Sequence, residues 1–149
     1  MVDKIEIHNT CLERLQSQID ELKSAIDKVH ESVINEQNST AGNKFETARA
    51  MGQEELDRLN RQLNNANVQM NMLSQIDPTI KCTSAQMGAI IKTTRKTLYL
   101  SIGLGKILLD KKPVFAISSI SPIGKNIMGK EVGDKATFAG KNETITEIY

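Results

Sequence analysis

Few side chains in this sequence have the types and spacing that chemistry on a substrate would need. His8 and Cys11 stand one helical turn apart and could both bind a metal, but a zinc site needs more ligands and none follows nearby. The glycines and lysine of 103–106 lack the full spacing of a phosphate loop, so a turn between strands explains them better. Neither histidine lies in the C-terminal half, and no Ser-His-Asp or Cys-His set is indicated. We therefore expect a protein that is not an enzyme and has no metal or cofactor of its own, with His8 a tolerated polar residue.

Two long helices dominate the first half of the chain. Residues spaced alternately by three and four form a narrow seam, which is typical of a helix that packs along one partner helix. The first run, polar only at His8, is Ile5, His8, Leu12, Leu15, Ile19, Leu22, Ile26, Val29 and Val33. The second is Leu56, Leu59, Leu63, Ala66, Met70 and Leu73, and it extends backward less regularly to Gly52, Arg49 and Phe45.

A short polar patch, residues 37–43, separates the two runs. Gly42 suits the left-handed residue that closes a helix, and Asn43 and Glu46 have the spacing of a cap box that opens the next one. We therefore predict an antiparallel hairpin over residues 1–76 in a monomer, with arms of roughly 33 residues that reach about 50 Å. A homodimer through parallel coiled coils is the less favoured alternative, because a continuous rod needs no stop and restart.

The second half changes character at Asp77-Pro78, where proline disfavours continuation of the helix. Short β-branched segments follow at 89–94, 96–101, 114–117, 136–138 and 143–148, with turns at 111–113, 129–133 and 140–142. Ser121 and Pro122 have the cap and first-turn positions of a short helix over 123–128. The sequence predicts an α+β protein whose residues 77–149 form a small antiparallel β-sheet domain with one short helix.

Charge and cysteine content limit the cellular setting. Residues 1–76 have a net charge of −4 and residues 77–149 one of +5. A positive surface favours nucleic acid or an acidic protein, but the bases are scattered and only two Tyr and three Phe could stack on nucleotides. Cys11 and Cys82 are too few for a small secreted scaffold, and no membrane span or leader is visible. We expect a cytoplasmic protein with reduced thiols.

The segment 119–134, Ser-Ile-Ser-Pro-Ile-Gly-Lys-Asn-Ile-Met-Gly-Lys-Glu-Val-Gly-Asp, resembles the C-terminal signature of the bacterial Gre transcript-cleavage factors. Met87-Gly88-Ala89 and the Phe45–Arg49 segment resemble two further family motifs, in the same order. Gre factors have a coiled-coil hairpin followed by a domain similar to the FK506-binding fold, so the resemblance covers essentially the whole chain.

The resemblance implies RNA polymerase as the partner, with DNA and RNA touched only indirectly in the elongation complex. The domain would dock at the rim of the secondary channel through Ser121, Pro122, Ile123 and Ile127, while Met128 is expected in the core. The hairpin would pass down the channel. Gre factors present carboxylates at the tip that help to hold a second magnesium of the polymerase active site.

The tip departs from this family pattern. Asn38 and Ala41 stand where the family has two acids, and Asn43 is also uncharged. Glu36 and Glu46 are the nearest carboxylates, and Glu36 could compensate if the loop register shifts by two residues. We therefore expect a Gre-like elongation factor with weak stimulation of cleavage, which instead modulates or blocks the channel. A coiled-coil scaffold for another protein is the alternative, and a prolyl isomerase is disfavoured because its aromatic-lined site has too few candidates here.

Overall fold

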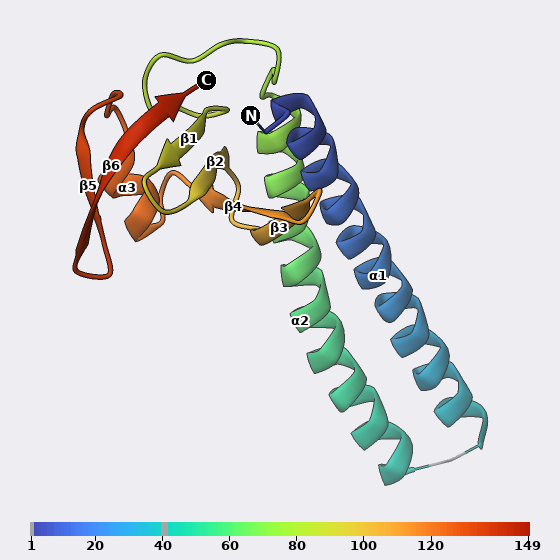
Figure 1. Cartoon of the computed structure of the whole chain (residues 1–149). Helices are drawn as coiled ribbons and strands as arrows, with labels where there is room; N and C mark the ends of the chain where they lie inside the picture. Colours follow the sequence, from blue (N-terminus) through green and yellow to red (C-terminus); the bar gives the residue numbers. More distant parts are fainter. Residues whose placement is uncertain (1, 40–41) are drawn as a thin grey trace. The chain divides into compact units, whose positions relative to one another are not determined.

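The computed structural model describes residues 2–39 and 42–149 (Figure 1). The chain divides into two compact units, one formed by the first 14 residues with residues 71–149, the other by residues 15–70. The start of the first helix belongs to the globular unit because Lys4, His8 and Arg14 hydrogen-bond to residues beyond position 77. This grouping follows compactness, and the division into a hairpin domain of residues 1–76 and a globular domain of residues 77–149 stays a prediction.

Two α-helices, α1 (Lys4–Ser39) and α2 (Asn43–Ser74), form the hairpin. Asp3 caps α1, because its Oδ1 accepts hydrogen bonds from the backbone N–H groups of Ile5 and Glu6 at 3.0 and 3.2 Å. In the unit of residues 15–70 the arms run antiparallel, and a Cβ placed on Gly52 would lie 2.5 Å from Cγ2 of Val33. The hairpin is therefore confirmed.

The seam is confirmed along the middle of both arms and differs at the start of α1. The buried members there are Leu15, Ile19, Leu56, Leu59 and Ala66. Ile5, predicted in the seam, is 46% exposed, whereas Ile7 and Cys11 are fully buried. The buried stripe is shifted because this part of α1 belongs to the same compact unit as the sheet.

The connection between the helices is shorter than the expected loop of residues 37–43. Helix α1 continues to Ser39, and α2 begins at Asn43. The carbonyl of Gly42 accepts the backbone N–H of Glu46 at 3.3 Å, so Gly42 takes the backbone position that we assigned to Asn43. Gly42 has the predicted left-handed conformation, with φ of 75°.

The second half forms six strands and one short helix, α3 (Pro122–Ile127). The strands are β1 (Ile90–Thr93), β2 (Thr97–Ser101), β3 (Gly105–Leu109), β4 (Lys112–Ser118), β5 (Lys135–Phe138) and β6 (Lys141–Ile148), in the order β3-β4-β2-β1-β6-β5. The sheet is mostly antiparallel, as predicted. Strands β2 and β4 are the exception, because they pair in parallel with Leu98 opposite Phe115.

The sequence analysis missed β3 and therefore misplaced a turn. The turn lies at Asp110 and Lys111, both left-handed with φ of 49° and 65°, while Lys112 and Pro113 already belong to β4. Proline is tolerated there because the pairing of β4 with β2 begins only at Phe115. The last hairpin turns at Ala139 and Gly140, just before the expected 140–142.

One core cluster of the globular unit joins the sheet to α3. Strand residues Ile91, Leu98, Leu100 and Ile145 are buried together with Ile127 of α3. Phe115, Ile117, Ile123 and Ile148 pack against this cluster while remaining partly exposed. Helix α3 is thus held on the sheet mainly by Ile127 and partly by Ile123, while Pro122 at its start is exposed.

Candidate functional site

The beginning of α3 is built by a network of short hydrogen bonds around Ser121. Its Oγ accepts the backbone N–H of Gly124 at 3.0 Å and donates to the carbonyl of Ser118 at 2.6 Å. Pro122 takes the first helical position, where it needs no N–H partner. The cap and the proline predicted from the sequence are therefore both confirmed. They fix the direction in which the turn before α3 projects.

Five apolar residues in and around α3 differ in their exposure. Ile120 is 76% exposed and Pro122 is exposed, so both could contact a partner. Ile123 is half-buried against the core. Ile127 is fully buried, which corrects its assignment to the docking surface, and Met128, expected in the core, is 42% exposed. The apolar surface just before α3 is therefore the turn Ile120–Pro122, with Met128 exposed just after the helix. Sequence reasoning did not single out Ile120.

One of the predicted tip residues, Glu36, lines a small hollow near the end of the hairpin. Glu36 of α1 lines a hollow of about 330 Å³ with four residues of α2, Lys44, Thr47, Ala48 and Met51. Glu46 is exposed but does not line this hollow. Asn38 is the penultimate residue of α1 and Asn43 the first of α2, but their side chains, like the whole of Ala41, lie outside what the structure describes. The lining of this hollow thus includes one carboxylate, that of Glu36, and one cation, that of Lys44.

The side chains of His8 and Cys11 are both buried. Nδ1 of His8 lies 2.7 Å from the hydroxyl oxygen of Tyr99 in a buried hydrogen bond, and the two rings meet edge to face. Burial raises the pKa of the Cys11 thiol to about 12 and also raises the pKa of Tyr99. Within the described residues, no group of three or more His, Cys, Asp or Glu side chains could hold a metal ion. His8 is therefore a structural partner of Tyr99, a role that its seam position did not indicate.

The burial of His8 against Tyr99 predicts that the globular unit loses stability in mild acid. Burial lowers the pKa of folded His8 below its usual 6.5, although the carboxylate of Asp77 partly opposes this. The unfolded chain then binds the proton more readily, so the contribution of His8 is complete above pH 6.5 and declines as the pH falls further. Urea unfolding at neutral and at mildly acidic pH should show a decline that H8Q reduces. The exposed His30 provides the control, and an equal effect of H30Q would contradict the assignment to His8.

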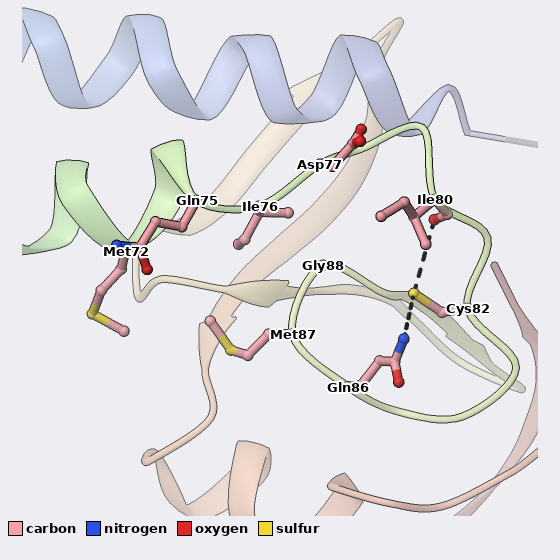
Figure 2. Close-up of a pocket in the computed structure, with 9 residues that line it drawn as sticks. All are labelled: Met72, Gln75, Ile76, Asp77, Ile80, Cys82, Gln86, Met87 and Gly88. Carbon is pink, nitrogen blue, oxygen red and sulfur yellow. Dashed lines mark hydrogen bonds between the residues drawn. The ribbon is translucent and has the colours of Figure 1, made fainter.

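Cys82 lines a hollow of about 400 Å³, formed by residues 72, 75–77, 80, 82 and 86–88 (Figure 2). Its Sγ accepts Nε2 of Gln86 at 3.3 Å and donates to the carbonyl of Ile80 at 3.9 Å. Nζ of the buried Lys4 donates to the same carbonyl at 2.7 Å and reaches the Cys82 sulfur at 3.6 Å. Cys82 is 6% exposed, so these bonds tie the loop before β1 to the start of α1.

Fold and site together define a helical hairpin combined with a mixed six-stranded domain that presents one capped helix. Among solved structures, the chain is similar to a GreA factor homolog, Gfh1 of Thermus thermophilus. The identity is 19%, the match covers 93% of this chain and 94% of that one, and the TM-score is 0.34. This is a weak likeness, and it carries no argument about function. No protein-family model and no curated protein matches the sequence.

Across residues 2–39 and 42–149, no helix has both the length and the apolar character needed to span a membrane.

Proposed function

We propose that this chain is a Gre-like transcription elongation factor that binds RNA polymerase at the secondary channel, acts in the cytoplasm and has no catalytic activity of its own. The observation that carries the proposal is the form of the segment 119–134. Its sequence resembles the Gre signature, and in the structure it forms a capped helix preceded by an exposed apolar turn.

The exposure of two residues supports the proposed docking surface. Ile120 and Pro122 are exposed on a turn whose backbone is fixed by the Ser118–Ser121 hydrogen bonds. A rigid apolar turn loses little conformational entropy on binding, so it suits a specific contact with another protein. The hairpin would supply the arm that enters the channel, since α1, with 36 residues, is about 54 Å long.

The tip residues favour modulation of the polymerase over stimulation of cleavage. Magnesium binds charged oxygen ligands, and an amide or a methyl group at positions 38 and 41 cannot replace a carboxylate. Lys44 lines the same hollow as Glu36 and adds a positive charge where a magnesium-binding tip needs negative charge. We therefore propose that the arm acts by occupying the channel.

Adding carboxylates to the tip is expected to restore cleavage. Asn38→Asp with Ala41→Glu should raise the cleavage rate of backtracked RNA by about tenfold or more, because two anionic ligands can support the second magnesium. The assay uses stalled elongation complexes with purified polymerase. Asn60→Asp with Asn64→Glu adds the same charge at exposed positions of α2 and should change nothing.

Two results would contradict this account of the tip. Strong cleavage by the natural protein that is lost in E36Q or E46Q would show that one of these carboxylates is already a ligand. Unchanged weak cleavage by the double carboxylate variant, with polymerase bound, would show that the tip does not reach the metal.

The isomerase alternative has no support from the surface hollows. Of the three hollows described above or below, none is lined by more than one aromatic residue. Phe138 and Tyr99 are buried, and Phe115 packs against the core. A scaffold that binds another protein is the explanation to adopt if the polymerase is not bound. Capture of polymerase from a cell extract by the tagged chain tests the proposal.

A further inference from the structure

A basic hollow of about 540 Å³ lies where neighbouring strands of the sheet begin or end. Its lining comes from β1, β2, β4, β6, the turn between β1 and β2, and Val2. Four cationic side chains line it, namely Lys92, Arg95, Lys96 and Lys112, and Glu147 is its one carboxylate. Thr97 adds a hydroxyl group. We refer to this site as the basic hollow.

The parallel pairing of β2 and β4 explains why these residues meet. Leu98 pairs with Phe115, so the beginnings of β2 and β4 lie at the same end of the sheet. Lys112 is therefore placed close to Lys96 although 16 residues separate them in the sequence. In an all-antiparallel sheet, as predicted from the sequence, Lys96 and Lys112 would not have to lie close together. The bases that appear scattered along the chain are thus gathered by the topology.

The charges of the basic hollow are only partly neutralised. Nζ of Lys96 lies 3.2 Å from the carboxylate of Glu143, which is 3% exposed, and 4.5 Å from the centre of the Phe138 ring. Nζ of Lys92 lies 3.6 Å from the carboxylate of Glu147.

Two cations remain available to an external anion. Arg95 and Lys112 are exposed, and neither forms an ion pair with any described residue. They give the hollow an excess of positive charge that faces solvent.

We propose that the basic hollow binds the phosphates of a single-stranded nucleic acid. Arg95 can donate two parallel hydrogen bonds to one phosphate, and Lys112 offers a point charge to the next. A volume of about 540 Å³ is in the range of small-ligand sites, so it suits a single strand better than the broad side of a duplex. The one aromatic residue, Phe115, packs against the core, so we expect contact with the backbone and little preference for sequence.

A protein partner fits this hollow less well. The centres of protein interfaces are depleted of charged residues and are built around buried aromatic or arginine anchors. Here charged groups from three strands and one turn surround a partly buried ring. The proposal is independent of polymerase binding, because it rests on residues distant in sequence from the α3 turn and concerns the free protein.

The test measures binding of fluorescein-labelled single-stranded RNA of mixed sequence to the full chain by anisotropy across a range of salt concentrations. Arg95→Gln with Lys112→Gln should weaken binding at low salt several-fold. The slope of log K against log salt is negative, and each lost phosphate contact reduces its magnitude by about 0.7. The double variant should therefore reduce the magnitude by about 1.4. Lys135→Gln with Lys141→Gln removes the same charge from exposed residues outside the hollow and should leave the slope close to that of the natural protein.

Three outcomes would overturn the proposal. The first is no binding of RNA even at low salt. The second is an equal loss in both double variants, which would mean that only overall charge matters. The third is competition by polyglutamate as effective as that by unlabelled RNA of equal charge, which would assign the hollow to an acidic protein segment.

Discussion

Replacing Gly124 with alanine is expected to destabilise the globular unit by about 3 kcal/mol, because the new methyl group has no room. The Cβ would overlap the carbonyl oxygen of Ser118 and lie 2.9 Å from its carbonyl carbon and from Cα of Ser119. These are backbone atoms, and that carbonyl also accepts the N–H and hydroxyl of Ser121. The clash cannot be relieved without opening the cap of α3.

Thermal unfolding followed by near-ultraviolet circular dichroism measures this effect. A loss of about 3 kcal/mol corresponds to a decrease in Tm of about 12–24 °C for a domain of this size. Gly103 provides the control, since a Cβ there meets nothing within 4 Å and its backbone does not have a positive φ. Equal Tm values for G124A and G103A would show that α3 can move away from Ser118.

The second large effect is expected on polymerase binding. Ile120→Asp with Pro122→Asp should weaken the affinity for RNA polymerase about 100-fold, because charge replaces the apolar surface of the turn. Both positions are exposed, so the fold should tolerate the change. Ile123 and Ile127 are unsuitable targets, because they contribute to the core.

An exposed leucine elsewhere on the same domain gives the matched control. Leu108 on β3 is 62% exposed, and L108D places an acid on a different strand. It should bind polymerase as the natural protein does. Equal losses in L108D and in the double variant would contradict an interface centred on the α3 turn.

The sequence predicted most of the fold wherever a local pattern determined it. The three–four spacing identified both arms, and Ser121 with Pro122 identified the cap of α3, whose bounds lie one residue before the expected 123–128. The pattern failed at Ile5 and Ile7, because the beginning of α1 belongs to the sheet-containing unit as well as to the hairpin. Periodicity reports one packing face and cannot reveal a second.

The pairing of the strands depends on contacts between distant residues, which no local pattern reports. Strand β3 is short and follows Gly103, and its turn at Asp110 and Lys111 has none of the usual glycine or asparagine. Without β3, the parallel partnership of β2 with β4 could not be inferred. The basic hollow was missed for the same reason.

The candidate site was predictable in place but not in orientation. The motif identified the segment around α3, yet which residues face the core depends on how the helix sits on the sheet. Ile127 therefore changed from surface to core, and Met128 from core to surface. His8 was missed as a partner of Tyr99 because 91 residues separate the two in the sequence.

Direct binding to purified core RNA polymerase is the most decisive measurement for the central claim. The full chain, labelled at an exposed position of β5, would be titrated with polymerase and then displaced with a bacterial Gre factor. The account predicts a saturable one-to-one complex that the Gre factor displaces and that the Ile120→Asp, Pro122→Asp variant fails to form. No binding by the natural protein, or binding that a Gre factor does not displace, would contradict it.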